Sequence, residues 1–262
     1  AGVSYRLGER NSFFFSFAVA QKEPTRGDFT DRYMFTADYT YPSSEKLYDW
    51  ELGYTYTAPR LSLGVNLYYM KYKDQLVPMG RINDGYDALN DRGVELSASW
   101  KVTGWFTASA NATFSQNRIE NYVDALKDSP TYGKELGDMT IAYSPDVIAN
   151  AFLNFHHRGF EAVFHTQHVG KQYFTNNEND ALSLDAYCVT NLNLAYTFRT
   201  RSARSVRLGL LINNLFNAEY ESNGYGYSYM DTWSGPAPVR IDEAYYFPQA
   251  PLNVLANVTV KF

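Results

Sequence analysis

The feature that most constrains the fold of this chain is an alternation of apolar and polar residues that recurs along its length. In residues 93–102 apolar side chains alternate with polar ones such as Glu95 and Lys101, and residues 105–117 repeat the pattern after a tight turn at Thr103. Successive side chains of a β-strand point to opposite faces, so a period of two predicts strands with one apolar and one polar face.

Short turns and long connections also alternate along the chain, and this order favours one class of β-protein. Bacterial outer-membrane barrels have short turns on one side of the membrane and long loops on the other, whereas sandwiches mix loop lengths at both ends. We therefore predict an all-β, antiparallel transmembrane β-barrel, with a soluble β-rich binding domain as the alternative. About eleven strands are expected, at residues 2–8, 12–20, 46–57, 61–73, 93–102, 105–117, 145–156, 159–169, 187–199, 204–216 and 252–262.

Composition is compatible with a barrel although the mean hydropathy of −0.39 resembles that of a soluble domain. The longest apolar runs, such as 208–212, fall far short of the roughly 20 residues that a membrane helix needs. Membrane strands place only every second side chain in lipid and so remain polar on average. The aromatic content of 17%, with 23 Tyr and 17 Phe, is typical of the girdles at membrane interfaces.

Several function classes receive no support from the sequence. A net charge of −5 without a basic stripe predicts no nucleic-acid partner, and the absence of GxSxG, HExxH and phosphate-loop motifs predicts a protein that is not an enzyme. Cys188 has no second cysteine to pair with, and His165 and His168, three apart on one strand, would face opposite sides. We therefore predict no metal site, no catalytic residue and no cofactor.

An odd strand count bears on how the chain is organised. Single-chain bacterial barrels have even strand numbers, and eleven is half of the 22 strands found in plugged outer-membrane transporters. Residues 3–7 already alternate like a strand, and residues 1–5 carry no signal peptide. We expect residues 1–262 to form the C-terminal part of a 22-stranded barrel.

Four stretches carry a resemblance to a known family. Residues 253–262 resemble the closing strand of an outer-membrane barrel, with Phe262 as the terminal aromatic, and residues 212–220 contain an Asn-Leu-Phe-Asn core followed by Tyr. The latter is similar to the penultimate-strand motif of TonB-dependent receptors, while residues 20–26 and 44–54 resemble receptors of this family from Bacteroidetes-like bacteria. The chain is thus identified by resemblance as the C-terminal half of a TonB-dependent receptor barrel.

That resemblance implies location in the outer membrane and energised uptake of a scarce ligand, foremost a ferric siderophore or similar metal chelate. The expected partners are outer-membrane lipid, an N-terminal plug and the other barrel strands, the TonB complex acting through the plug, the chelate, and a surface lipoprotein. The plug and the TonB box are absent from residues 1–262. Two alternatives stay open: the same machinery could import cobalamin, haem, a peptide or a glycan, or the barrel could be a passive porin or an adhesin.

Ligand-binding residues are expected in the long connections, where a rigid scaffold can vary its recognition chemistry. Tyr and Trp supply rigid amphipathic contact area, and guanidinium groups match carboxylate and catecholate oxygens. Packing among loops and salt bridges within them are the competing explanations for the same residues. The candidates are Arg26, Arg32, Tyr33, Arg81, Tyr86, Tyr132, Tyr225, Tyr227, Trp233 and Arg240.

Overall fold

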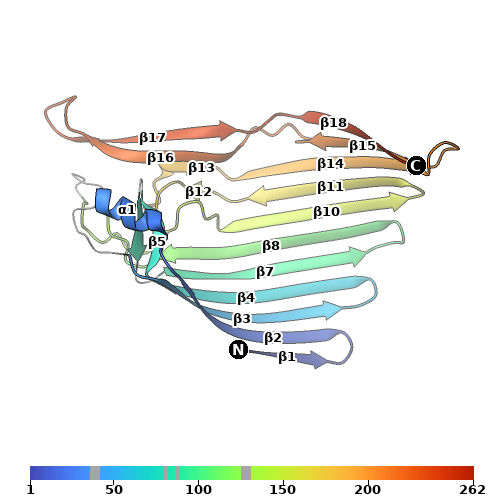
Figure 1. Ribbon diagram of the computed structural model, residues 1–262, viewed down its shortest axis with the longest axis horizontal. Helices are drawn as coiled ribbons and strands as arrows, with labels where there is room; N and C mark the ends of the chain where they lie inside the picture. The colour runs from blue at the N-terminus through green and yellow to red at the C-terminus, as the bar shows by residue number, and fades with distance from the viewer. Residues whose placement is uncertain (36–41, 80–81, 87–88, 125–130) are drawn as a thin grey trace.

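One large antiparallel sheet, the wall, dominates the computed structural model, which describes residues 1–35, 42–79, 82–86, 89–124 and 131–262 (Figure 1). Its main path contains eleven strands in the order β1-β2-β3-β4-β7-β8-β10-β11-β14-β15-β18, and the short β9 (Met139–Thr140) pairs with β8 beside that path. The prediction of eleven antiparallel wall strands is therefore confirmed. The wall strands are β1 (Gly2–Leu7), β2 (Asn11–Lys22), β3 (Glu45–Thr57), β4 (Leu61–Lys73), β7 (Leu89–Lys101), β8 (Phe106–Ile119), β10 (Val147–His157), β11 (Phe160–Val169), β14 (Tyr187–Phe198), β15 (Ser205–Asn213) and β18 (Asn253–Lys261).

The short turns lie at one end of the wall and the long connections at the other (Figure 1). The long connections contain secondary structure that the sequence analysis did not predict. No helix within the described ranges is both long enough and apolar enough to cross a membrane. The additional elements are α1 (Arg26–Phe35), the hairpin of β5 (Gln75–Met79) and β6 (Ile82–Tyr86), the pair β12 (Gln172–Tyr173) and β13 (Ser183–Leu184), the 3-10 helix η1 (Asp180–Leu182), and the hairpin of β16 (Glu221–Asp231) and β17 (Val239–Pro248).

The two faces of the wall differ in polarity, as the period-two pattern predicts. Strand pairing aligns Leu52 with Leu67, and these apolar side chains are 52% and 44% exposed. The opposite face is polar, and there Ser16 donates a hydrogen bond to Glu51 at 3.2 Å while Arg207 binds both carboxylate oxygens of Glu161. An apolar surface of this extent requires a lipid or protein partner, whereas the polar face suits a wet interior.

Fully buried side chains within the described ranges gather at the long-connection end, between the wall and the elements that cover it. Two clusters form there, one at the ends of β7 and β8 and one around β12, η1 and β13. The wall itself is one layer thick, so its side chains contact each other only across strands. The clusters are Val77, Leu89, Ile119 and Tyr122, and Phe174, Leu182 and Leu184.

Strand β15 ends at Asn213, earlier than the predicted end at residue 216. Asn214 adopts a left-handed backbone with φ of 52°, which stops the pairing of β15, and its side chain exchanges two 2.8 Å hydrogen bonds with the backbone of Ala218. Asn217 is also left-handed, and its side chain accepts a hydrogen bond from the Leu252 backbone. The Asn-Leu-Phe-Asn core is therefore a side-chain-stabilised turn.

Candidate functional site

The hairpin of β16 and β17 forms its own two-stranded sheet and extends past the wall at the long-connection end (Figure 1). In its register Tyr225 pairs with Tyr245, Tyr227 with Glu243, and Gly226 with Ala244. Because side chains alternate between faces, the tyrosines and Glu243 share one face, and the small residues occupy the other. The hairpin thus has an aromatic face and a packing face.

The packing face rests on the cluster around Phe174. A Cβ atom at Gly224 would lie 2.6 Å from Cζ of Phe174, and one at Gly226 would lie 2.8 Å from Cδ2 of Leu182. Both glycines therefore permit a close approach that any other residue would block. The Phe174 ring also lies 5.9 Å from Tyr143 and 5.8 Å from Tyr246. We call the hairpin together with residues 172–184 the platform.

An aromatic strip runs along the exposed face of the platform. The rings of Tyr225 and Tyr245 are stacked at 5.0 Å, Tyr227 lies 6.4 Å from Tyr245, and Tyr229 stacks on Trp233 at 6.2 Å with an interplanar angle of 6°. Tyr225, Tyr227 and Tyr245 are each more than two-fifths exposed, and Trp233 is 74% exposed. Rigid aromatic surface of this kind can bind a ligand with little loss of side-chain entropy.

Glu243 lies within the strip and accepts hydrogen bonds from three phenols. Tyr227 donates at 2.6 Å and Tyr245 at 3.0 Å to one carboxylate oxygen, and Tyr229 donates at 3.2 Å to the other. These bonds, led by that from Tyr227, hold the pKa of Glu243 below its ordinary value, and the Glu243 carboxylate raises the pKa of Tyr227. The strip therefore carries a fixed negative charge with its phenol groups oriented around it.

Arg240 lies on the packing face, away from the strip. Its guanidinium contacts Asp242 at 3.1 Å and Ser228 at 3.0 Å. Although burial opposes ionisation of Asp242, hydrogen bonds from neighbours that include Ser228 and Arg240 outweigh it and lower the pKa of this carboxyl. Arg240 is therefore a paired structural residue of the hairpin in this conformation.

Glu178 links the base of the platform to the wall. Its carboxylate accepts hydrogen bonds from the backbone and hydroxyl of Thr140 and pairs with Arg118 at the end of β8. Burial opposes ionisation of Glu178, but the Thr140 bonds and the Arg118 charge prevail and lower the pKa of the carboxyl. Nearby, the side chain of Asn176 accepts a hydrogen bond from the Ala142 backbone at 2.8 Å. These contacts fix residues 172–184 against the wall.

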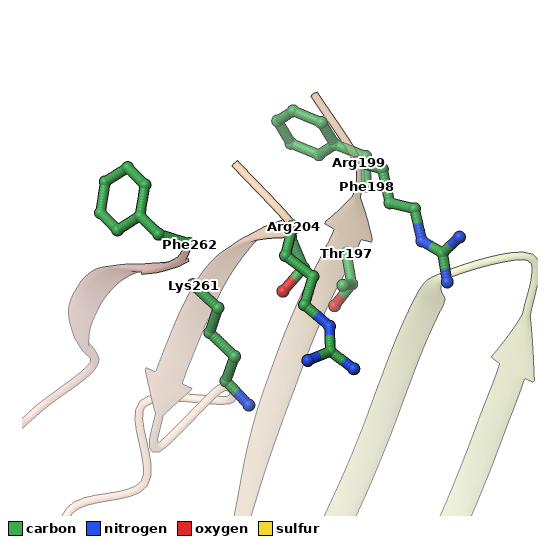
Figure 2. A pocket seen from close by; sticks show the side chains of 7 residues that line it. Thr197, Phe198, Arg199, Arg204, Lys261 and Phe262 are labelled. Carbon is green, nitrogen blue, oxygen red and sulfur yellow. The ribbon is translucent and has the colours of Figure 1, made fainter. Parts of the chain in front are cut away.

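A cavity of about 740 Å³ lies at the opposite end of the wall, between the β14–β15 turn and the end of β18 (Figure 2). Figure 2 shows Arg204 and Lys261 extending in the same direction, whereas the rings of Phe198 and Phe262 project the other way. This continues the two-faced pattern of the wall. The cavity belongs to the short-turn end and lies far from the platform. Its lining residues are Thr197, Phe198, Arg199, Arg204, Ser205, Lys261 and Phe262.

Comparison with known proteins identifies the family. The profile described as "TonB dependent receptor-like, beta-barrel" matches residues 1–215. The chain belongs to this family. Its wall is accordingly an outer-membrane barrel wall, with the apolar face in lipid and the long connections on the extracellular side. No sequence match is found among curated proteins.

Solved structures agree with this TonB-dependent receptor fold. The ferric yersiniabactin uptake receptor FyuA from Yersinia pestis is 19% identical with a TM-score of 0.69, over 100% of this chain and 36% of that one. The copper transporter OprC is 17% identical with a TM-score of 0.70, over 97% and 38%. The siderophore receptor PiuA from Acinetobacter baumannii is 13% identical with a TM-score of 0.71, over 98% and 34%. The chain thus spans about a third of the length of these proteins.

The predicted ligand-binding residues of this receptor barrel do not all lie together. Tyr225, Tyr227 and Trp233 lie on the aromatic strip, and Arg240 lies on the hairpin's other face. Tyr132 is 53% exposed in a separate extracellular turn. Arg26, Arg32 and Tyr33 belong to α1, Tyr86 is the last residue of β6, and Arg81 lies outside the described residues.

The structure adds site residues that the sequence analysis did not select. Glu243 and Tyr245 are central to the strip, and Tyr229 joins it to Trp233. The period-two pattern of residues 225–229 and 243–245 could have indicated these residues, because each arm of the hairpin places every second side chain on the aromatic face. Within the described residues, no group of three or more His, Cys, Asp or Glu side chains could hold a metal ion.

Proposed function

We propose that this chain forms part of the barrel of an outer-membrane receptor that takes up a scarce metal chelate, foremost a ferric siderophore, by TonB-dependent energised transport. The observation that carries the proposal is the platform, whose aromatic strip is exposed on the extracellular side and supported from beneath by Phe174. Preorganised aromatic surface contributes most where ligands bind through rings and apolar groups. No covalent catalysis is part of the proposal.

The proposal includes components beyond the wall: further barrel strands, a plug inside the barrel, the TonB complex acting on that plug, and a surface lipoprotein. In support, β1 and β18 lie at the two edges of the wall, and among the described strands each has a neighbour on one side only. Unpaired backbone groups are costly in lipid, so a wall of this kind needs strands that close it. The polar inner face is suited to a hydrated or plugged lumen.

A second candidate cargo is an uncharged one, such as a glycan. The strip carries Glu243 as its charged group, and Arg240 is paired on the other face. An anionic chelate would be repelled by that carboxylate unless its metal centre or its rings faced the strip. Sugar rings also bind to flat aromatic surfaces, with carboxylates accepting their hydroxyl hydrogens.

Uptake by living cells tests the proposal. Iron-limited cells that lack the gene are complemented with the wild-type receptor, and ⁵⁵Fe-chelate accumulation is measured with and without a protonophore. We expect uptake that depends on the receptor and is abolished by the protonophore. Uptake that persists without the proton gradient would indicate a passive porin, and uptake of labelled glycan but not of iron would indicate the second candidate.

A matched pair of variants connects uptake to the strip. Tyr227→Ser removes a strip phenol, whereas Tyr196→Ser removes a similarly exposed tyrosine from the lipid-facing face near the short turns. We expect the first variant to lower the rate of uptake at limiting cargo at least fivefold and the second to leave it unchanged. Equal effects of the two would show that the strip does not contact the cargo.

A further inference from the structure

Four exposed basic side chains lie close together on the lipid-facing side of the wall, at the extracellular ends of β3, β4 and β7. Lys46 pairs in register with Lys73, Lys71 with Tyr48, and Arg92 with Tyr69. Each occupies a position of the alternation that continues the apolar outer face rather than the polar inner one. We call Lys46, Lys71, Lys73 and Arg92 the basic cluster.

The level of the basic cluster follows from the aromatic side chains beside it. Trp50 and Tyr69 pair in register, and their rings lie 5.5 Å apart on the lipid-facing surface. Trp and Tyr in such positions mark the boundary between hydrocarbon and headgroups. Lys71 and Lys73 lie two and four residues beyond Tyr69, which places their backbones roughly 7 and 13 Å further along the tilted strand toward its extracellular end. The ammonium groups therefore reach the headgroup layer of the outer leaflet.

The charges of the basic cluster are not neutralised within the described part of the chain. None of the four forms an ion pair there, and Arg92 donates only to the neutral side chain of Gln116. Arg118, the next cation on this face, is paired with Glu178. The neighbouring carboxylate of Glu120 accepts a hydrogen bond from Asn90.

The basic cluster is also local, not a belt around the wall. On the other wall strands with a described extracellular end, the outermost lipid-facing position carries no Lys or Arg, except on β8, where Arg118 is paired with Glu178. A belt that served only to mark the membrane boundary would extend along the whole wall. Those positions are Gln21 on β2, Val147 on β10, His168 on β11, Cys188 on β14, Ile212 on β15 and Val254 on β18.

We propose that the basic cluster is a binding site for the phosphate groups of an outer-leaflet glycolipid. Four cations on three adjacent strands match a headgroup that presents more than one phosphate, and long Lys and Arg stems can follow the apolar surface up to it. Trp50 and Tyr69 contact the first part of its acyl chains. Because the basic cluster lies at the extracellular ends of the strands, the lipid beside it belongs to the outer leaflet, whose glycolipid carries such phosphates.

Lipid binding by the full-length receptor tests this site. Purified receptor in detergent is titrated with lipid A, enzymatically dephosphorylated lipid A or phosphatidylglycerol, and the bound lipid is counted by native mass spectrometry. We expect wild-type receptor to bind lipid A at least tenfold more tightly than either other lipid. Equal affinity for dephosphorylated lipid A would overturn the proposal, and equal affinity for phosphatidylglycerol would overturn its assignment to a glycolipid.

Two multiple variants separate the site from general charge effects. The variant K46Q/K71Q/K73Q/R92Q should bind lipid A no better than the dephosphorylated form, and replacing the three lysines by arginine should preserve binding. The control K22Q/K101Q/K261Q removes lysines from inward-facing positions of β2, β7 and β18 and should bind as wild type does. Heat-modifiable mobility on gels verifies that each variant is a folded barrel. Unchanged lipid A binding by a folded quadruple variant refutes the site, whatever the cargo of the receptor.

Discussion

Replacing Phe174 by Ala should loosen the platform while leaving the wall intact. Phe174 is only 5% exposed, and its ring supports Gly224 and Gly226 from beneath. Phe→Ala substitutions in cores cost about 3–5 kcal/mol. We take about 3 kcal/mol, since this cluster is small. At about 1.4 kcal/mol per factor of ten, local opening of β16–β17 should become roughly 100-fold more frequent.

Hydrogen exchange followed by mass spectrometry measures this opening directly in the full-length receptor. Amides of β16 and β17 should exchange about 100-fold faster in Phe174→Ala, whereas those of β10 and β11 should be unaffected. Phe174→Leu is the matched control and should cost only about 1 kcal/mol, because most of the volume is kept. Unchanged exchange of the hairpin in Phe174→Ala would refute the argument that the platform depends on this ring.

Three further predictions concern single polar groups. The pKa of Glu178 is lowered in the folded state, so its contribution to stability should be complete above the ordinary value of 4.5 and lost as the pH falls through the lowered pKa. Hydrogen exchange of residues 172–184, measured between pH 6 and pH 3 and corrected for intrinsic rates, should show this loss in wild type but not in Glu178→Gln. Tyr227→Phe removes the shortest hydrogen bond to Glu243 and should weaken cargo binding several-fold by calorimetry, with hairpin exchange unchanged. Asn214→Ala deletes two hydrogen bonds at a left-handed position and should destabilise the barrel by about 1–3 kcal/mol in denaturant. Asn214→Gly loses the same hydrogen bonds but adopts the left-handed backbone without strain, so its smaller loss isolates the backbone contribution. Equal losses in the two variants would contradict a backbone contribution at this position.

The wall could be predicted from the sequence because the alternation that defines each strand is visible in neighbouring residues. Each strand repeats one period-two pattern, and a shift by one residue would turn every apolar side chain inward. The errors lie where that pattern ends. Strand β7 begins at Leu89 instead of 93, since polar residues there pair beyond the lipid-facing stretch. Strand β15 ends early because Asn214 takes a left-handed backbone, which a run of apolar neighbours does not reveal.

The candidate site was predicted only in part, because it depends on contacts distant in sequence. The aromatic residues of the last connection were selected from composition alone, and this found Tyr225, Tyr227 and Trp233. Composition could not show that the Arg240 side chain lies on the other face, or that the Glu243 carboxylate accepts hydrogen bonds from three phenols. Those facts follow from the hairpin register, which the packing of Gly224 and Gly226 on residues 172–184 stabilises.

Identification of the bound cargo is the sharpest test of chelate uptake by this receptor. The full-length receptor would be isolated in mild detergent from outer membranes of iron-limited cells supplied with their own spent medium, and its metal and organic content measured by elemental and molecular mass spectrometry. We predict about one iron per receptor together with an organic chelator, both lost in a variant that lacks the strip phenols Tyr225, Tyr227 and Tyr245. A stoichiometric glycan, peptide or cobalamin without iron, or the same iron content in that variant, would contradict it.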